Sequence, residues 1–180
     1  MQTEIDKALA VLKKGGIILY PTDTIWGIGC DATNTNAIAK IFELKKRSDS
    51  NALISLVANK QQLKTITKTI PDLDITSSPT TIVYPNIKGV NQNLLAENGS
   101  AAIRIVQDKF CQRLIISFGK AIVSTSANIS GEIAPKQFSE ISKEIKNNVD
   151  YIVNLRQNEI MSTPSSILMI NEDTSITKIR

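Results

Sequence analysis

Apolar residues recur along the chain with two alternating spacings, and this alternation predicts interleaved helices and strands. Between residues 5 and 12 the aliphatic side chains fall on one face at helical spacing, and Gly15-Gly16 supplies a C-terminal stop. The next apolar run, residues 17–20, is too short for a helix and stops at Pro21, as expected of a buried strand. The chain is therefore predicted to begin with a helix that leads into a strand.

Similar reasoning assigns the remaining elements. A second helix is expected to begin at Asn34 or Thr35, which can cap it, and to end by the Lys45-Lys46-Arg47 cluster, where cations suit a helix C-terminus. Because the last two predicted strands are adjacent in sequence, they suggest a hairpin, so an α/β fold with a mixed sheet is favoured over a purely parallel one. Further helices are expected at 60–68, 108–118 and 137–147, and strands at 53–57, 80–84, 101–106, 121–124, 151–154, 166–170 and 175–179.

The composition limits both the size of the fold and its chemistry. At 180 residues, with 42% hydrophobic and only 4% aromatic content, the chain suits one globular domain with a mostly aliphatic core. It contains no histidine. That absence removes Ser-His-Asp and Cys-His nucleophile pairs, histidine general bases and nearly all catalytic zinc arrangements. Chemistry on this chain must rest on Lys, Arg, hydroxyls, amides, carboxylates or groups of the ligands.

The net charge and the two cysteines indicate which ligands and which cellular compartment suit the chain. Lysine and arginine total 21 against 17 for aspartate and glutamate, a net charge of +4. This charge suits an anionic ligand such as a nucleotide or tRNA, and solubility alone explains it as well. Cys30 and Cys111 follow no metal-ligand spacing and are expected to be reduced, buried thiols. The N-terminus lacks an apolar signal core and no stretch approaches the ~20 apolar residues of a membrane span, so a cytoplasmic protein without membrane contact is expected.

Three unusually polar loops, at 21–29, 47–51 and 125–131, lie where predicted elements end. Ligands in open α/β sheets bind in crevices at the carboxyl ends of strands, so these loops mark a candidate site. In the first loop, residues 22–24 (Thr-Asp-Thr) crowd two hydroxyls and a carboxylate onto a strand end, and the glycines at 27 and 29 allow close backbone approach to a ligand. A proline-initiated turn held by its own hydrogen bonds explains the same residues.

The second and third loops offer cations and short hydrogen-bond donors. Lys45 and Arg47 stand two residues apart and could converge where their helix ends, with Arg47 suited to bidentate binding of phosphate or carboxylate. A solvated helix C-terminus explains them too. In the third loop Ser126, Asn128 and Gly131 could hold phosphate or ribose oxygens, although a hydroxyl-rich turn has the same composition. The loop lacks the spacing of a Walker A motif, and the chain has no G-x-G-x-x-G sequence.

Taken together, the three motifs resemble the YrdC family of threonylcarbamoyl-AMP synthases. They are the Pro-Thr-Asp-Thr loop (21–24), the Lys-x-Arg pair (45–47) and the Ser-x-Asn-x-Ser-Gly loop (126–131), in the family's order. The likeness runs from the first helix to the segment 164–180, which is similar to the family's closing strands. It implies a single YrdC-like domain over residues 1–180, in the short form of the family. It also implies a twisted open mixed sheet with flanking helices and a ligand cavity.

The resemblance implies a role for individual residues. On the amino-acid side, Arg104 would pair with the carboxylate of L-threonine, and the full set of threonine-binding residues would be Thr24, Arg104, Ser124 and Ser165. On the nucleotide side, the ATP-binding residues would be Arg47, Asn51, Ser100, Ser126 and Arg180. The residues closest to the chemistry would be Lys45, Arg47, Ser126 and Asn128.

Several positions depart from the family pattern. Ser48 and Ala52 stand where prolines are common, and Trp26 replaces the usual tyrosine. Leu56 occupies a position that is histidine in many longer members, and Ala134 falls where a nucleotide-contacting serine can occur. These departures bear on loop rigidity and affinity more than on the reaction.

The reaction that the resemblance implies suits a chain without histidine. The amine of L-threonine adds bicarbonate to form a carbamate, whose oxygen attacks the α-phosphorus of ATP and expels pyrophosphate, so no protein nucleophile is needed. Mg²⁺ would accompany ATP, held mostly by phosphates and water, and no protein ligand is assigned to it. The product would serve N6-threonylcarbamoylation of adenosine 37 in tRNAs that read ANN codons. Downstream tRNA threonylcarbamoyl-transfer proteins are the implied partners, and direct binding of tRNA or double-stranded RNA is left open.

Two alternatives belong to other functional classes. A non-catalytic RNA-binding module fits the mild basic charge, but the few aromatics and the lack of an RRM or KH signature argue against it. A carbamoyl-adenylate enzyme of the hydrogenase-maturation type would use carbamoyl phosphate, and such enzymes normally belong to longer multidomain chains. Threonine- and bicarbonate-dependent release of pyrophosphate distinguishes the synthase from the RNA-binding module, and the length of 180 residues counts against the second alternative.

Overall fold

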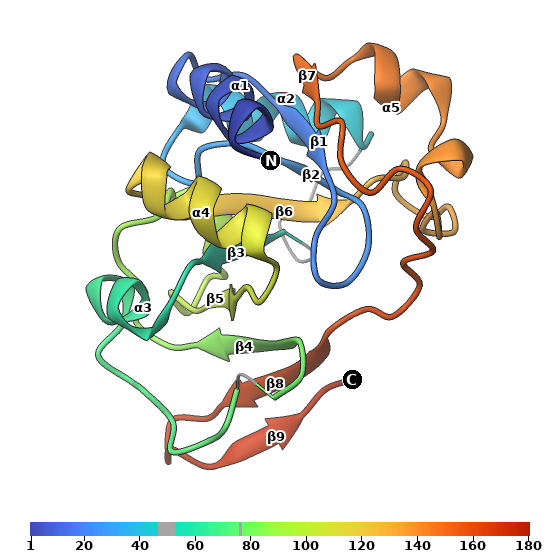
Figure 1. Ribbon diagram of the computed structural model, residues 1–180. Helices are drawn as coiled ribbons and strands as arrows, with labels where there is room; N and C mark the ends of the chain where they lie inside the picture. Colours follow the sequence, from blue (N-terminus) through green and yellow to red (C-terminus); the bar gives the residue numbers. More distant parts are fainter. Residues whose placement is uncertain (47–52, 76) are drawn as a thin grey trace.

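A mixed β-sheet organises the protein (Figure 1). The computed structural model describes residues 1–46, 53–75 and 77–180, and within these residues nine strands form one sheet in the order β7-β1-β2-β6-β3-β5-β4-β8-β9. The pairs β1–β7, β3–β5 and β4–β8 are parallel and the others antiparallel, which confirms the predicted mixed α/β fold. The strands are β1 (Ile18–Tyr20), β2 (Gly27–Gly29), β3 (Ile54–Val57), β4 (Thr80–Tyr84), β5 (Ala101–Ile105), β6 (Ile122–Ser126), β7 (Tyr151–Ile152), β8 (Ser166–Ile170) and β9 (Ile176–Lys178).

Most of the helices begin at a side-chain cap that the sequence supplies. Asn34 accepts a hydrogen bond from the backbone N–H of Ala37 at 3.0 Å, so Asn34 rather than Thr35 caps the second helix. Asp108 caps α4 in the same way, and Gly119 ends that helix in the left-handed conformation at φ 77°. The helices are α1 (Gln2–Lys13), α2 (Thr35–Leu44), α3 (Lys60–Ile66), α4 (Lys109–Phe118) and α5 (Lys143–Asn147), with 3₁₀ turns η1 (Gln92–Leu94) and η2 (Phe138–Glu140).

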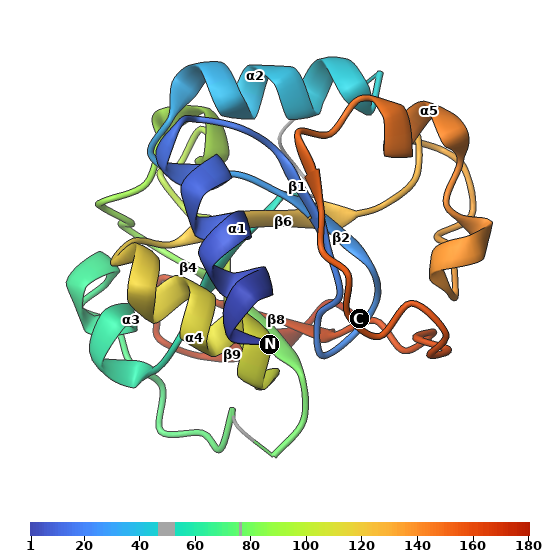
Figure 2. The ribbon, with the colours of Figure 1, turned by 45° about the horizontal axis from the view of Figure 1, so that its top comes forward.

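Helices cover both faces of the sheet. Neighbouring residues of a strand point to opposite faces, and Ile18 packs with the apolar residues of α1 and α4 whereas Leu19 packs with those of α2 and α3. Helices α1 and α4 lie side by side (Figure 2). The cores are aliphatic, as the composition predicts, and their largest buried side chain is Trp26.

The structure corrects two element predictions. The segment 27–29 was expected to be loop, but it forms β2, the middle strand between β1 and β6, because glycine lets neighbouring backbones approach closely. A Cβ on Gly29 would lie 2.4 Å from the carbonyl oxygen of Val123. The helix expected over 137–147 is instead the turn η2 followed by α5, because Ser142 accepts a hydrogen bond from the N–H of Ile145 and starts a new helix there.

The predictions of a C-terminal hairpin and of buried cysteines are confirmed. Strands β8 and β9 form the predicted antiparallel C-terminal hairpin. Cys30 and Cys111 are free and buried, and burial raises the pKa of both thiols. In the described part of the chain, none of the helices has the length and apolar character needed to cross a bilayer.

Candidate functional site

A cavity of about 550 Å³ opens on the sheet between the loop that joins β1 to β2 and the C-terminal hairpin. Its walls come from segments far apart in sequence: the 22–27 loop, strands β3 to β6, the residues before β8 and the end of the chain. Six of the residues predicted for the site line it, namely Thr24, Arg104, Ser124, Ser126, Ser165 and Arg180. These six side chains therefore meet in one concave space.

The hydroxyl of Thr24 is oriented by its neighbour Thr22. The Oγ1 of Thr22 donates to the carbonyl of Ile25 at 2.7 Å and accepts from the backbone N–H of Thr24 at 3.1 Å. The two threonine hydroxyls lie 3.0 Å apart, and because the proton of Thr22 is already used, Thr24 must donate in that bond. The lone pairs of the Thr24 hydroxyl are then left to accept a hydrogen bond from a ligand in the cavity.

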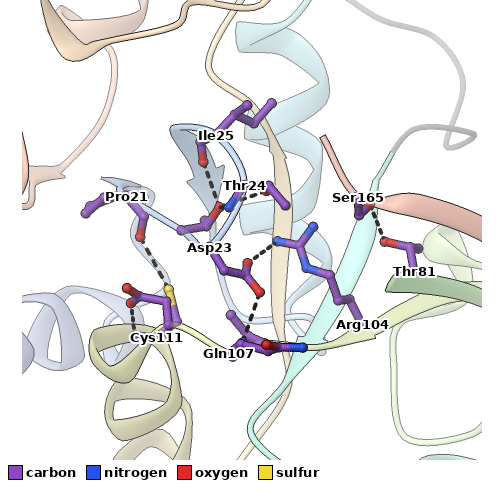
Figure 3. A network of polar contacts seen from close by, with 12 residues as sticks. Pro21, Asp23, Thr24, Ile25, Thr81, Arg104, Gln107, Cys111 and Ser165 are labelled. Atoms are coloured by element: carbon purple, nitrogen blue, oxygen red, sulfur yellow. Dashed lines mark hydrogen bonds and ion pairs between the residues drawn. The ribbon is translucent and has the colours of Figure 1, made fainter. Parts of the chain in front are cut away.

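Arg104 is a buried cation whose counter-ion is Asp23 (Figure 3). Its Nη2 lies 2.9 Å from Oδ1 of Asp23, and the two side chains are only 3% and 8% exposed. The other carboxylate oxygen accepts from the backbone N–H of Gln107 at 2.9 Å. Asp23 thus fixes the guanidinium against the cavity wall, while Nε of Arg104 is buried without a hydrogen-bond partner among the described residues.

The rest of the 21–24 loop is also anchored from outside. The thiol of Cys111 donates to the carbonyl of Pro21 at 3.3 Å. Arg156, at φ 54°, donates through Nη1 both to the carbonyl of Thr22 at 3.0 Å and to the carboxylate of Asp108 at 2.8 Å. Sequence reasoning did not assign a role to Arg156, because nothing near it in the sequence indicates a partner more than 100 positions away.

Lys45 does not line the cavity. It is 2% exposed, and its Nζ donates to the carbonyl oxygens of Ser126 and Asn128, each at 2.7 Å. Its own carbonyl accepts from the N–H of Ser130 at 3.1 Å. The amine of Lys45 therefore fixes the backbone of the third polar loop by hydrogen bonds.

The remaining predicted residues are placed less centrally. Asn128 donates from its amide to the carbonyls of Ile129 and Glu132 at 2.9 and 2.8 Å, which closes the third loop on itself. Ser100 lies in the turn before β5, where its backbone bonds to Asn98 and Ala96, and it does not line the cavity. The positions Arg47, Ser48, Asn51 and Ala52 lie outside the described residues.

The part of the cavity wall formed by β4 and by the residue before β8 carries a pair of buried hydroxyls. Oγ1 of Thr81 and Oγ of Ser165 lie 2.8 Å apart, and both residues line the cavity. Arg180 donates from Nε and Nη2 to the carbonyl of Ser165 at 3.3 and 3.0 Å. Thr81 belongs to none of the three motifs, and its place in the site could not be read from the sequence.

Three departures from the family pattern can now be located. Ala134 lines the cavity, so a hydroxyl is missing from that wall. Leu56 is fully buried in the core beneath α1 and α4 and does not line the cavity. Trp26 is also fully buried, and the centroid of its ring lies 5.1 Å from the centroid of the Phe138 ring.

Within the residues described, no three His, Cys, Asp or Glu side chains gather closely enough to hold a metal ion. The cavity is lined by hydroxyls and by the two arginines Arg104 and Arg180, a composition that suits recognition of anionic oxygens.

A family model for Sua5, YciO and YrdC proteins, described as "Telomere recombination", matches residues 10–180. The chain belongs to this family. Among its relatives is a protein of Blochmanniella pennsylvanica named threonylcarbamoyl-AMP synthase, which is 32% identical over 168 residues, covering 87% of this chain and 83% of the relative. The family predicted from the three sequence motifs is thereby confirmed.

Solved structures of the family share the fold. A double variant of P. abyssi Sua5 superposes with a TM-score of 0.86 at 25% identity, covering 98% of this chain and 55% of that one. P. abyssi Sua5 complexed with L-threonine superposes with a TM-score of 0.82 at 23% identity, covering 98% of this chain. This family member therefore spans about half the length of P. abyssi Sua5.

Proposed function

We propose that this family member is an L-threonylcarbamoyladenylate synthase, a nucleotidyltransferase that forms L-threonylcarbamoyl-AMP and pyrophosphate from L-threonine, bicarbonate and ATP. The observation that carries the proposal is the shared cavity, in which Arg104, held by Asp23, and hydroxyls from four separate segments line one space. A relative that is 32% identical over most of both chains bears the name of this enzyme. P. abyssi Sua5, whose fold is shared, has been solved with L-threonine bound.

The geometry suits a reaction that needs positioning rather than a protein nucleophile. The threonine amine attacks bicarbonate with loss of water, and a carbamate oxygen then forms a bond to the α-phosphorus as the bond to pyrophosphate breaks. Arg104 would bind the carboxylate of L-threonine, and the Thr24 hydroxyl would accept a hydrogen bond from the nitrogen of L-threonine. Ser124 lines the same cavity. Ser126 and Arg180, which line the cavity, would orient the nucleotide. The family resemblance also assigns nucleotide contacts to Ser100 and Asn128, which are not among the lining residues, and to Asn51, which lies outside the described residues. Holding two anionic ligands in register is the source of rate enhancement here.

Lys45 is proposed as a positioning residue for the nucleotide side of the cavity. Because its amine bonds to the carbonyls of Ser126 and Asn128, it sets the backbone of the loop that presents the Ser126 hydroxyl. Arg47 would supply charge neutralisation at the phosphates. Mg²⁺ bound to ATP would neutralise further phosphate charge.

The biological setting is part of the same proposal. The product would be consumed in N6-threonylcarbamoylation of adenosine 37 of tRNAs that read ANN codons, by downstream threonylcarbamoyl-transfer proteins in the cytoplasm. Residues 1–180 would act as one catalytic domain. Filter binding at several salt concentrations would measure whether the chain also contacts tRNA directly.

The test is pyrophosphate release by the purified chain with ATP, Mg²⁺, labelled bicarbonate and each amino acid in turn. We expect release that requires both L-threonine and bicarbonate, with label carried into an adenylate. Release that requires carbamoyl phosphate instead would identify the hydrogenase-maturation type of reaction. Salt-sensitive RNA binding without any turnover would identify an RNA-binding module and contradict the proposed function.

Replacing Arg47 by alanine is expected to lower threonine-dependent pyrophosphate release at least tenfold, because one charged contact to the phosphates would be lost. The melting temperature should stay close to that of the unaltered chain. Near-normal turnover in a folded Arg47→Ala protein would remove this residue from the mechanism.

Restoring a hydroxyl at Ala134 is expected to strengthen ATP binding. Ala134→Ser adds one donor to the cavity wall, and a single neutral hydrogen bond corresponds to about a two- to tenfold lower KM for ATP. The KM for threonine serves as the internal control and should not change. An unchanged KM for ATP would show that this wall does not face the nucleotide.

A further inference from the structure

Thr81 is a buried hydroxyl on the cavity wall to which none of the three motifs assigns a role. It lies in β4 with no exposed surface, yet it lines the cavity. In the β4–β5 ladder it is the register partner of Arg104, and its Oγ1 lies 2.8 Å from Oγ of Ser165. Two hydroxyls and one guanidinium therefore share a wall, and Figure 3 shows the guanidinium between Asp23 and the hydroxyl pair.

The hydroxyls of Thr81 and Ser165 provide two O–H donors, and the hydrogen bond between them uses only one. Each hydroxyl carries one proton and can accept hydrogen bonds, so whichever residue donates to the other, one O–H remains for a third group. The two residues are only 0% and 6% exposed, and a buried O–H without an acceptor is unfavourable. The pair is thus built to donate to an acceptor that enters the cavity.

The backbone of Ser165 is fixed by hydrogen bonds, so the direction of its hydroxyl depends mainly on the side-chain rotamer. The N–H of the next residue, Ser166, donates to the carbonyl of Pro79 at 3.0 Å, and the guanidinium of Arg180 holds the Ser165 carbonyl. The hydroxyl of Thr81 is then the group that selects the direction of the Ser165 hydroxyl. Thr81 itself is constrained, because a β-branched residue in a strand has few rotamers.

The acceptor that fits this wall has two oxygens in one plane. Arg104 has used Nη2 on Asp23 and has a buried Nε without a partner among the described residues. A carboxylate could accept from the guanidinium through one oxygen and from the hydroxyl pair through the other. A neutral amide would offer only one oxygen to these donors.

We infer that Thr81 and Ser165 act as one hydrogen-bonding unit that binds the carboxylate of the amino-acid substrate beside Arg104, with Thr81 as the positioning residue. The inference rests on the proposed function and adds Thr81 to the amino-acid side of its site. It makes Thr81 a determinant of selection for the free α-carboxylate.

The test is calorimetric binding of L-threonine and of L-threonine amide to variants of the full chain. Thr81→Val keeps the branched shape and removes the hydroxyl, and it should raise the Kd for L-threonine about tenfold. The Kd for the amide, which has no carboxylate, should change less than twofold, and the KM for ATP should stay unchanged. Thr81→Ser should bind threonine like the unaltered chain. Thr80→Val is the matched control, since Thr80 is the neighbouring strand residue and its hydroxyl bonds to the carbonyl of Ser78.

A second pair of variants covers the case in which valine disturbs the fold. Thr81→Ser and Thr81→Ala differ by one hydroxyl, and the tenfold loss should appear between them. The double variant Thr81→Val/Ser165→Ala should bind threonine no more weakly than Ser165→Ala alone, because the two hydroxyls act together. Equal losses for threonine and its amide, or an unchanged Kd in the variants that lack the Thr81 hydroxyl, would overturn the inference while leaving the synthase activity in place. Failure of the unaltered chain to bind or turn over threonine would overturn both.

Discussion

Replacing Arg104 by glutamine is expected to weaken threonine binding at least about thirtyfold and to lower the free energy of unfolding by about 3–5 kcal/mol. The second effect arises because the buried Asp23 side chain would lose its counter-ion. The substitution thus removes a ligand contact and breaks a buried ion pair at once. Equilibrium urea unfolding measures the stability, and calorimetry measures the threonine affinity.

A double variant separates the two effects. Asp23→Asn together with Arg104→Gln leaves two neutral amides that can bond to each other, so most of the lost stability should return. Threonine binding should stay weak, because the guanidinium is still missing. If threonine affinity recovered along with stability, Arg104 would be a structural residue and not a ligand contact. Arg113→Gln is the control for the loss of an arginine, since Arg113 lies exposed on α4.

Replacing Lys45 by methionine is expected to destabilise the protein by about 3 kcal/mol or more and to reduce turnover strongly. The amine donates two hydrogen bonds of 2.7 Å to carbonyls, and bonds from a charged donor are worth about 1.5–3 kcal/mol each. Methionine fills the same space but leaves those carbonyls without this donor. The loop that presents Ser126 should then loosen even when no substrate is present.

The neighbouring lysine offers a matched control. Lys46 is exposed and pairs with Glu144 at 2.9 Å on the surface, so Lys46→Met should leave stability and turnover nearly unchanged. A Lys45→Met protein of normal stability that had lost only ATP affinity would show that the amine acts on the phosphates, as the motif resemblance implies. A combined loss of stability and of affinity for both substrates would support its positioning role.

The order of the elements and the three motifs could be predicted because both depend on local sequence. Helix α2 begins at Asn34 because its short side chain caps the helix, and the spacing of apolar residues marks α1 and α4. Strand β2 was missed since glycines carry no strand signal of their own. Its place in the sheet depends on how closely β1 and β6 approach it.

The sequence by itself determined which chemistry is open to this protein. It has no histidine, and its three polar loops carry hydroxyls and cations, a composition that favours catalysis by positioning and charge neutralisation. Only the tertiary structure decided which partner each polar group takes. Asp23 and Arg104 lie 81 positions apart, as do Lys45 and Ser126, and no local spacing signals either contact. Their pairing follows from burial, because a polar group removed from water takes whichever partner the packed chain brings within reach.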